Sequence, residues 1–119
     1  MATNDLTNAS VLVLGGSGAL GSRIARQLAE RGARLTLAGR SPERLATVAA
    51  TIGGCATTIA DLAIRDDATV AVDAALEAHG RIDGIVNAAG VVAFGPLAGT
   101  SPSVIDEVIA VDLTGPLHV

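Results

Sequence analysis

Short, largely apolar runs alternate along this chain with longer stretches whose apolar residues recur every three or four positions. The runs lie at residues 11–14, 35–38, 55–60 and 82–86 and are partly β-branched. Unbroken apolar runs of this length are typical of strands buried on both faces of a parallel sheet. The pattern therefore predicts four such strands, and the single cysteine, Cys55, is expected to be a small core residue of the third.

Four amphipathic helices are predicted between and after these strands. Gly32 ends the first, the second begins at the N-cap Ser41 before Pro42, the third spans about 65–79, and the fourth begins at 100–102. The residues expected to face the sheet are Leu20, Ile24 and Leu28 in the first helix, Leu45, Val48 and Ile52 in the second, Ala68, Val72, Ala75 and Leu76 in the third, and Val104, Ile105, Val108 and Ile109 in the fourth.

Alternating strands and helices with short connections predict an α/β fold, a Rossmann-type doubly wound parallel sheet. The expected strand order is 3-2-1-4, in one domain over residues 1–119 that stops after the fourth helix. Ligands of this fold bind at the carboxyl ends of the strands, between strands 1 and 4. The fourth strand has an unpaired apolar edge through Ile85 and Val86, which we expect the rest of a longer polypeptide, a second copy or another chain to cover.

Composition and charge exclude several classes of protein. Half of the residues are hydrophobic and 17% are charged, which argues against a disordered chain. The net charge is −4 and no basic block occurs, so we expect neither nucleic acid nor a membrane surface as a partner. The first ten residues lack the pattern of a secretory signal, and no long apolar window suggests a membrane span. We expect a cytoplasmic protein without a metal site.

Four glycines lie within seven residues directly after the first predicted strand, at Gly15, Gly16, Gly18 and Gly21. Residues 16–21 satisfy GxGxxG: Gly16 is expected to allow the turn, Gly18 the close approach of a pyrophosphate, and Gly21 close packing of the helix. Free N–H groups and the helix dipole then stabilise the phosphates. The loop residues between these glycines, also expected at the cofactor, are Ser17, Ala19 and Leu20.

Two alternative roles of the glycine loop stay open. Glycine-rich turns also serve packing, and proteins that bind S-adenosylmethionine can use a similar loop. A phosphate-binding P-loop is excluded, because the chain contains no lysine.

The end of the second strand indicates which dinucleotide is bound. Gly39 and Arg40 stand where NAD-specific proteins place a carboxylate for the ribose hydroxyls. A guanidinium there would pair with a 2′-phosphate, which favours NADP(H) over NAD(H) and argues against a methyltransferase. Ser41, the residue after Arg40, is also expected at the cofactor. The alternative is that Arg40 is merely solvated before a helix N-terminus, which is a poor place for a cation.

Two further motifs follow, Asp61-Leu62 and the Asn-Ala-Ala-Gly sequence at 87–90. Together with the glycine loop and Arg40, they make the chain resemble the short-chain dehydrogenase/reductase family from Ser10 to Val119. It departs from the family's TGxxxGxG loop at Leu14, where Thr is usual, and at Ala19, where a glycine is usual.

The resemblance implies roles for the positions that match the family's motifs. Asp61 would accept a hydrogen bond from the adenine amino group, and Leu62 would supply the adjoining backbone amide. Asn87 would brace the central strands, with a simple turn former as the alternative. Small residues would let the backbone pass beside the nicotinamide ribose, at Ala88, Ala89 and Gly90.

The sequence 111–115 looks like the family's VNLxG. Asp112 stands where the family has an Asn that is implicated in holding the catalytic lysine and a proton-relay water. A carboxylate could orient a water or an ammonium group in the same way. The alternative is an exposed helical acid.

The family's catalytic groups are missing. Its members use a Ser and a Tyr-x-x-x-Lys pair downstream of the fourth helix, but this chain has no Tyr and no Lys. His79 and His118 have no catalytic arrangement around them. We therefore expect the NADP(H)-binding half of an oxidoreductase for a small carbonyl or alcohol substrate, inactive alone. The alternatives are a non-catalytic NADP(H)-sensing module and, more weakly, an S-adenosylmethionine-binding fold.

Overall fold

A four-stranded parallel sheet forms the centre of the computed structural model, which describes residues 5–119. The strands are β1 (Ser10–Leu14), β2 (Arg34–Gly39), β3 (Ala56–Ile59) and β4 (Gly84–Asn87). Their order is β3-β2-β1-β4, which confirms the predicted Rossmann-type topology. In the register, Leu12 lies opposite Thr36 on one side and Ile85 on the other. The glycine loop after β1 therefore lies at the centre of the sheet's carboxyl edge.

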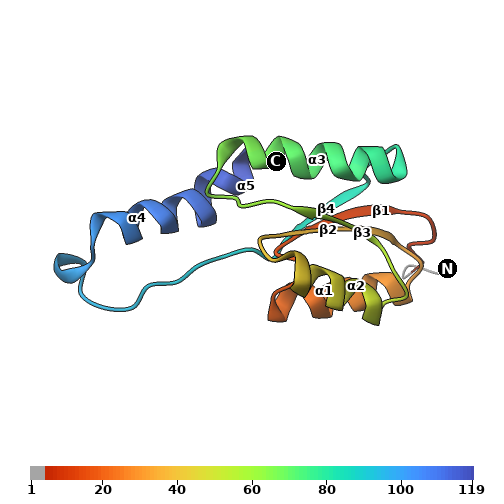
Figure 1. The fold of residues 1–119 in the computed structure, drawn as a ribbon, viewed down its shortest axis with the longest axis horizontal. Coiled ribbons are helices and arrows are strands. Elements are labelled where there is room, and N and C mark those ends of the chain that lie inside the picture. The colour runs from red at the N-terminus through yellow and green to blue at the C-terminus, as the bar shows by residue number, and fades with distance from the viewer. Residues whose placement is uncertain (1–4) are drawn as a thin grey trace.

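Helices cover both faces of the sheet (Figure 1). The helices α1 (Ala19–Glu30) and α2 (Pro42–Thr51) lie on one face, and α3 (Arg65–His79) lies on the other. After β4 the chain runs outward through the short 3-10 helix η1 (Leu97–Gly99) into α4 (Pro102–Ile109). A π-helical turn, η2 (Ala110–Thr114), leads into α5 (Gly115–Leu117), which lies beside α3 (Figure 1). This return brings η2 back to the carboxyl end of the sheet.

The core consists of two layers separated by the sheet. Toward α1 and α2 it contains Val11, Val13, Ala25, Leu35, Leu37 and Leu45. Toward α3 it contains Leu12, Leu14, Ala38, Ala60, Leu62, Ala71 and Ala75. Successive residues of β1 and β2 alternate between the two layers, so these strands are buried on both faces as predicted. Because β1 and β2 are buried, the positions at which the loops after them begin are held by the core.

The same expectation was wrong for the two outer strands. Exposure alternates along β3 and β4, because each lies at an edge of the sheet and has one strand neighbour. Cys55 is half-buried and precedes β3 instead of lying within it. β4 begins at Gly84, and the preceding Asp83 accepts a hydrogen bond from the Ser10 N–H through its carboxylate and donates its own N–H to the Ser10 carbonyl, both at 2.8 Å.

Three predicted core residues, Leu20, Leu76 and Ile109, are exposed. The helices approach the sheet through small residues, Gly21 and Ala25 in α1 and three alanines in α3, which leaves the larger neighbours at the margins of the contact. α4 has no fully buried residue because it lies beyond the end of the sheet (Figure 1). Its predicted apolar stripe exists, but within residues 5–119 no sheet strand covers it. No helix of the described chain is both long and apolar enough to cross a bilayer.

Candidate functional site

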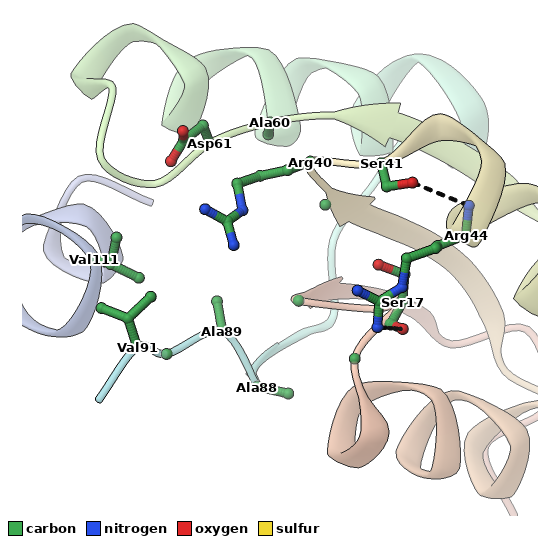
Figure 2. Close-up of a pocket in the computed structure, with 14 residues that line it drawn as sticks. Ser17, Arg40, Ser41, Arg44, Ala60, Asp61, Ala88, Ala89, Val91 and Val111 are labelled. Carbon is green, nitrogen blue, oxygen red and sulfur yellow. Dashed lines mark hydrogen bonds between the residues drawn. The ribbon is translucent and has the colours of Figure 1, made fainter. Parts of the chain in front are cut away.

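A cavity of about 350 Å³ opens at the carboxyl edge of the sheet (Figure 2). It lies where the fold places ligands, since its walls come from the loop after β1, the β2–α2 junction, and the segments after β3 and β4. The predicted site residues that line it are Gly15, Ser17, Gly18, Arg40, Ser41, Asp61, Ala88, Ala89 and Gly90. The other lining residues are Gly39, Arg44, Ala60, Val91 and Val111.

The glycine loop is shaped by three close backbone contacts. Gly15 has a φ of +69°, and a Cβ there would stand 2.6 Å from the Ala89 amide nitrogen. A Cβ on Gly16 would stand 2.9 Å from the Leu37 Cβ, and one on Gly21 would stand 2.0 Å from the Gly15 carbonyl oxygen. The packing role of Gly21 is therefore as predicted. Gly16 lies within the turn that the Gly18 N–H closes on the Gly15 carbonyl at 3.1 Å, and its missing side chain also makes room for Leu37 of β2.

Gly18 presents bare backbone to the cavity. It is the N-cap of α1, with extended dihedrals, no side-chain cap and no acidic residue in the first helical turn. A Cβ on Gly18 would meet only the Gly15 oxygen, at 3.4 Å. The positive end of α1 is thus left uncompensated beside an open backbone, which is an arrangement that favours an anion. Ala19 and Leu20 are exposed and do not line the cavity.

Two arginines lie at the β2–α2 junction. Ser41 caps α2 as predicted, since its Oγ accepts a hydrogen bond from the Arg44 N–H at 3.3 Å. Figure 2 shows Arg40 extending toward the side of the cavity where Asp61 lies, whereas Arg44 extends toward Ser17. The Arg44 Nη2 group donates to the Ser17 carbonyl at 3.3 Å. Arg44 was not predicted from the sequence, although its place in the first turn of the helix that follows Arg40 could have indicated it.

Asp61 lies at the end of β3 and lines the cavity. Its Oδ1 accepts a hydrogen bond from the Ala63 N–H at 2.9 Å, and its own N–H donates to Asp67 Oδ2 at 2.8 Å. These bonds fix the turn that holds the carboxylate at the cavity. The neighbouring Leu62 is buried in the core and does not line the cavity.

The segment after β4 forms the opposite wall. The Ala88 N–H donates to the Leu14 carbonyl at 2.9 Å, which extends the β1–β4 pairing by one bond. The Asn87 side chain is exposed, and its Oδ1 accepts from the Ala89 N–H at 3.2 Å. The Asn87 backbone pairs with Leu14 and so joins β4 to β1, while its side chain forms the local turn that was the alternative.

Asp112 lies in η2 and holds this wall in place. Its Oδ1 accepts a hydrogen bond from the Val91 N–H at 2.9 Å and would stand 3.5 Å from a Cβ on Gly90. It is exposed and does not line the cavity. The return of η2 also places Val111 against the cavity, which no local pattern indicated.

We next consider the histidines and other side chains that can bind metals, within residues 5–119 that the structure describes. His79 Nε2 lies 3.1 Å from the Leu35 carbonyl, to which its N–H can donate, and so joins α3 to β2. Among residues 5–119, no group of three or more His, Cys, Asp or Glu side chains could hold a metal ion.

The cavity fits the phosphate and adenosine parts of a dinucleotide by its donor set. The bare Gly18 backbone and the α1 N-terminus suit a diphosphate. Asp61 supplies an acceptor beside the small or apolar side chains of Ala60 and Val111, which suits a purine. Arg40 and Arg44 suit a further anionic group at the β2 side.

Comparisons with known proteins agree with this geometry. A model of the short chain dehydrogenase family matches residues 9–119. An uncharacterized oxidoreductase of Listeria monocytogenes is 30% identical over 117 residues, covering 95% of this chain and 47% of that protein. One from Mycobacterium tuberculosis is 36% identical over 108 residues, covering 89% of this chain and 40% of that protein. The chain thus spans about half the length of these relatives.

Solved structures give the same result. A metagenomic short-chain oxidoreductase in complex with NADP matches with a TM-score of 0.88 and 39% identity, over 95% of this chain and 53% of that one. A dehydrogenase/reductase from Sinorhizobium meliloti matches with a TM-score of 0.91 and 33% identity, over 98% of this chain and 48% of that one.

Proposed function

The chain belongs to the short chain dehydrogenase family, and from that premise we propose that it binds NADP(H) as the cofactor half of an oxidoreductase. The proposed reaction interconverts carbonyl and alcohol groups of a small molecule. The cofactor would supply or accept the hydride, while this chain would bind and orient it.

One observation supports the proposal most strongly. The uncapped N-terminus of α1 meets the bare Gly18 backbone at the same cavity that Arg40 and Asp61 line. A diphosphate at α1 would direct an adenosine toward the β2 and β3 ends, where the guanidinium and the carboxylate lie. In that position Gly15, Ser17 and Gly18 would surround the diphosphate, and Ala88, Ala89 and Gly90 would border the second ribose.

The absence of Lys and Tyr bears on activity, because the chain itself contains no side chain that can act as the family's acid and base pair. We expect the isolated chain to bind NADPH but not to oxidise it with carbonyl substrates. The test is steady-state NADPH oxidation compared with a heat-denatured sample. Turnover above that control would contradict this part of the proposal.

A non-catalytic module that senses NADP(H) is the second candidate, and the missing Tyr and Lys favour it. Reading the coding sequence downstream of codon 119 distinguishes the two. An in-frame Tyr-x-x-x-Lys about 30 to 50 residues further on supports the enzyme, a spacing that follows from the lengths of ordinary strands and helices.

An S-adenosylmethionine-binding fold is the weaker alternative. A carboxylate at the end of β2, where it would bind the ribose, would have favoured that ligand, but Arg40 stands at this position instead.

Two apolar surfaces of this half are exposed. Ile85 of the edge strand β4 is 46% exposed. An apolar groove of about 300 Å³ runs along α4, lined by Ala93, Gly95, Leu97, Thr100, Val104, Ile105, Val108 and Ile109. We propose that the rest of a longer polypeptide, a second copy or another chain covers these surfaces. Light scattering of the 119-residue chain tests the second of these, since self-association predicts a mass above 11.8 kDa.

A further inference from the structure

Arg44 reaches the candidate site from the first turn of α2. Its backbone N–H is held by the N-cap Ser41 at 3.3 Å, and its guanidinium extends back to the glycine loop (Figure 2). It lines the same cavity as Arg40, four residues earlier. Two guanidinium groups therefore border one cavity from the same junction.

The hydrogen bond that Arg44 makes there is one that an anion could replace. Its Nη2 lies 3.3 Å from the Ser17 carbonyl oxygen, which is slightly longer than the usual N–H···O bond, and both residues are exposed or partly exposed. The carbonyl is neutral. A phosphate oxygen accepts a shorter and roughly twice stronger bond from a guanidinium, often through two parallel N–H groups.

The charges around the junction also favour an anion. Within residues 5–119 the one ion pair that the structure shows joins Arg81 and Asp83, outside this cavity, so neither Arg40 nor Arg44 is neutralised by a carboxylate in the described chain. The nearest acid in sequence, Glu43, is engaged by the Ser41 hydroxyl at 3.2 Å. Asp61 is the single carboxylate among the residues that line the cavity, against two arginines.

We propose that Arg44 is a second specificity-determining residue, which binds the 2′-phosphate of the adenosine ribose together with Arg40. The inference rests on the proposed function, because the 2′-phosphate is what distinguishes NADP(H) from NAD(H). Arg44 exchanges the Ser17 carbonyl for the phosphate when the cofactor binds. In the empty cavity, its bond to Ser17 keeps the guanidinium directed toward the place where that phosphate will lie.

Calorimetric titration of the 119-residue chain with NADP⁺ and with NAD⁺ tests this inference. The variants are Arg44→Ala, Arg44→Lys and, as a matched control, Arg26→Ala, which removes an exposed arginine of α1 that does not line the cavity. We expect Arg44→Ala to weaken NADP⁺ about tenfold and to leave NAD⁺ within about twofold, as the loss of one charge-assisted contact predicts. Arg44→Lys should lie between, because it keeps the charge but loses the planar fork.

Each other outcome overturns a defined part of the account. Equal weakening of both dinucleotides by Arg44→Ala shows that Arg44 acts only through the glycine loop, which contradicts the inference. Unchanged affinities contradict it as well. If the unmodified chain prefers NADP⁺ and Arg44→Ala keeps that preference, this inference alone fails. If the unmodified chain binds neither dinucleotide, the proposed function fails with it.

Discussion

We propose that single residues at the ends of β2 and β1 determine which dinucleotide binds. Arg40 stands at the β2 end, lines the cavity, and forms no ion pair with the described residues 5–119. The glycines of the loop after β1 are not equivalent, since Gly15 has a positive φ, Gly16 and Gly21 leave room for neighbouring atoms, and Gly18 faces the cavity. Substitutions at these positions should therefore separate cofactor choice, packing and phosphate binding.

Changing Arg40→Asp should move the preference from NADPH to NADH. The carboxylate would repel a 2′-phosphate but accept hydrogen bonds from the ribose hydroxyls that NADH presents there. We expect NADPH affinity to fall at least about tenfold, because a hydrogen bond to a charged group is worth about 1.5–3 kcal/mol. Fluorescence titration with both dinucleotides measures it, with Arg26→Asp as the control. An unchanged ratio of the two affinities would remove the basis for naming NADP(H).

Gly21→Ala and Gly18→Ala should act on different properties. An added methyl at Gly21 would stand 2.0 Å from a backbone oxygen, so we expect the free energy of unfolding to fall by about 1–3 kcal/mol. At Gly18 the nearest atom is 3.4 Å away, and stability should change by less than about 1 kcal/mol while dinucleotide affinity falls. Urea denaturation and calorimetry measure the two properties. A stable Gly21→Ala chain, or unchanged binding by Gly18→Ala, would contradict these roles.

At the scale of elements, the local sequence pattern predicted the strands, helices and turns, but it did not predict how closely the helices pack against the sheet. The strand order followed from alternating β and α segments, and the glycine loop and the Ser41 cap were evident from residue types at fixed spacing. Leu20 and Leu76 could not be placed correctly, because their exposure depends on how closely α1 and α3 approach through small residues. Val91 and Val111 joined the site only because η2 returns to the sheet edge.

Asp112 should tie the segment after β4 to η2 through its bond to the Val91 N–H. Asp112→Ala removes the acceptor, so we expect faster hydrogen exchange at the Val91 amide and a loss of about 1 kcal/mol in stability. Asp112→Asn keeps an acceptor oxygen and should preserve the protection. Asp106→Ala, at an exposed position on α4, is the control. Equal protection in the Ala and Asn variants would show that the bond contributes nothing.

At the scale of the whole molecule, we expect two aspartates outside the site to make stability depend on pH. The hydrogen bond from the Ser10 N–H, with a further contribution from Arg81, holds the pKa of Asp83 below its ordinary 3.8. The Thr7 hydroxyl and N–H lower the pKa of Asp5 in the same direction. A carboxyl with a depressed folded pKa contributes stability that is present above its unfolded pKa and lost as the pH falls through the folded pKa.

The stability of the chain should therefore decline as the pH falls from about 5 toward about 2. In Asp83→Asn the decline should be shallower, because one of the carboxyls with a shifted pKa is gone, while Asp5 keeps its share. Thermal unfolding followed by circular dichroism over that pH range measures both slopes. Parallel curves for the two chains would show that Asp83 is not linked to folding.

We propose that the cavity at the carboxyl edge of the sheet binds the diphosphate of NADP(H) against the glycine loop. A crystal structure of this chain grown with NADP⁺ is the decisive test of this binding. We expect the diphosphate at the α1 N-terminus beside Gly18, the adenine near Asp61, and the 2′-phosphate between Arg40 and Arg44. Density for the dinucleotide elsewhere, or a cavity that stays empty at saturating cofactor, would contradict it.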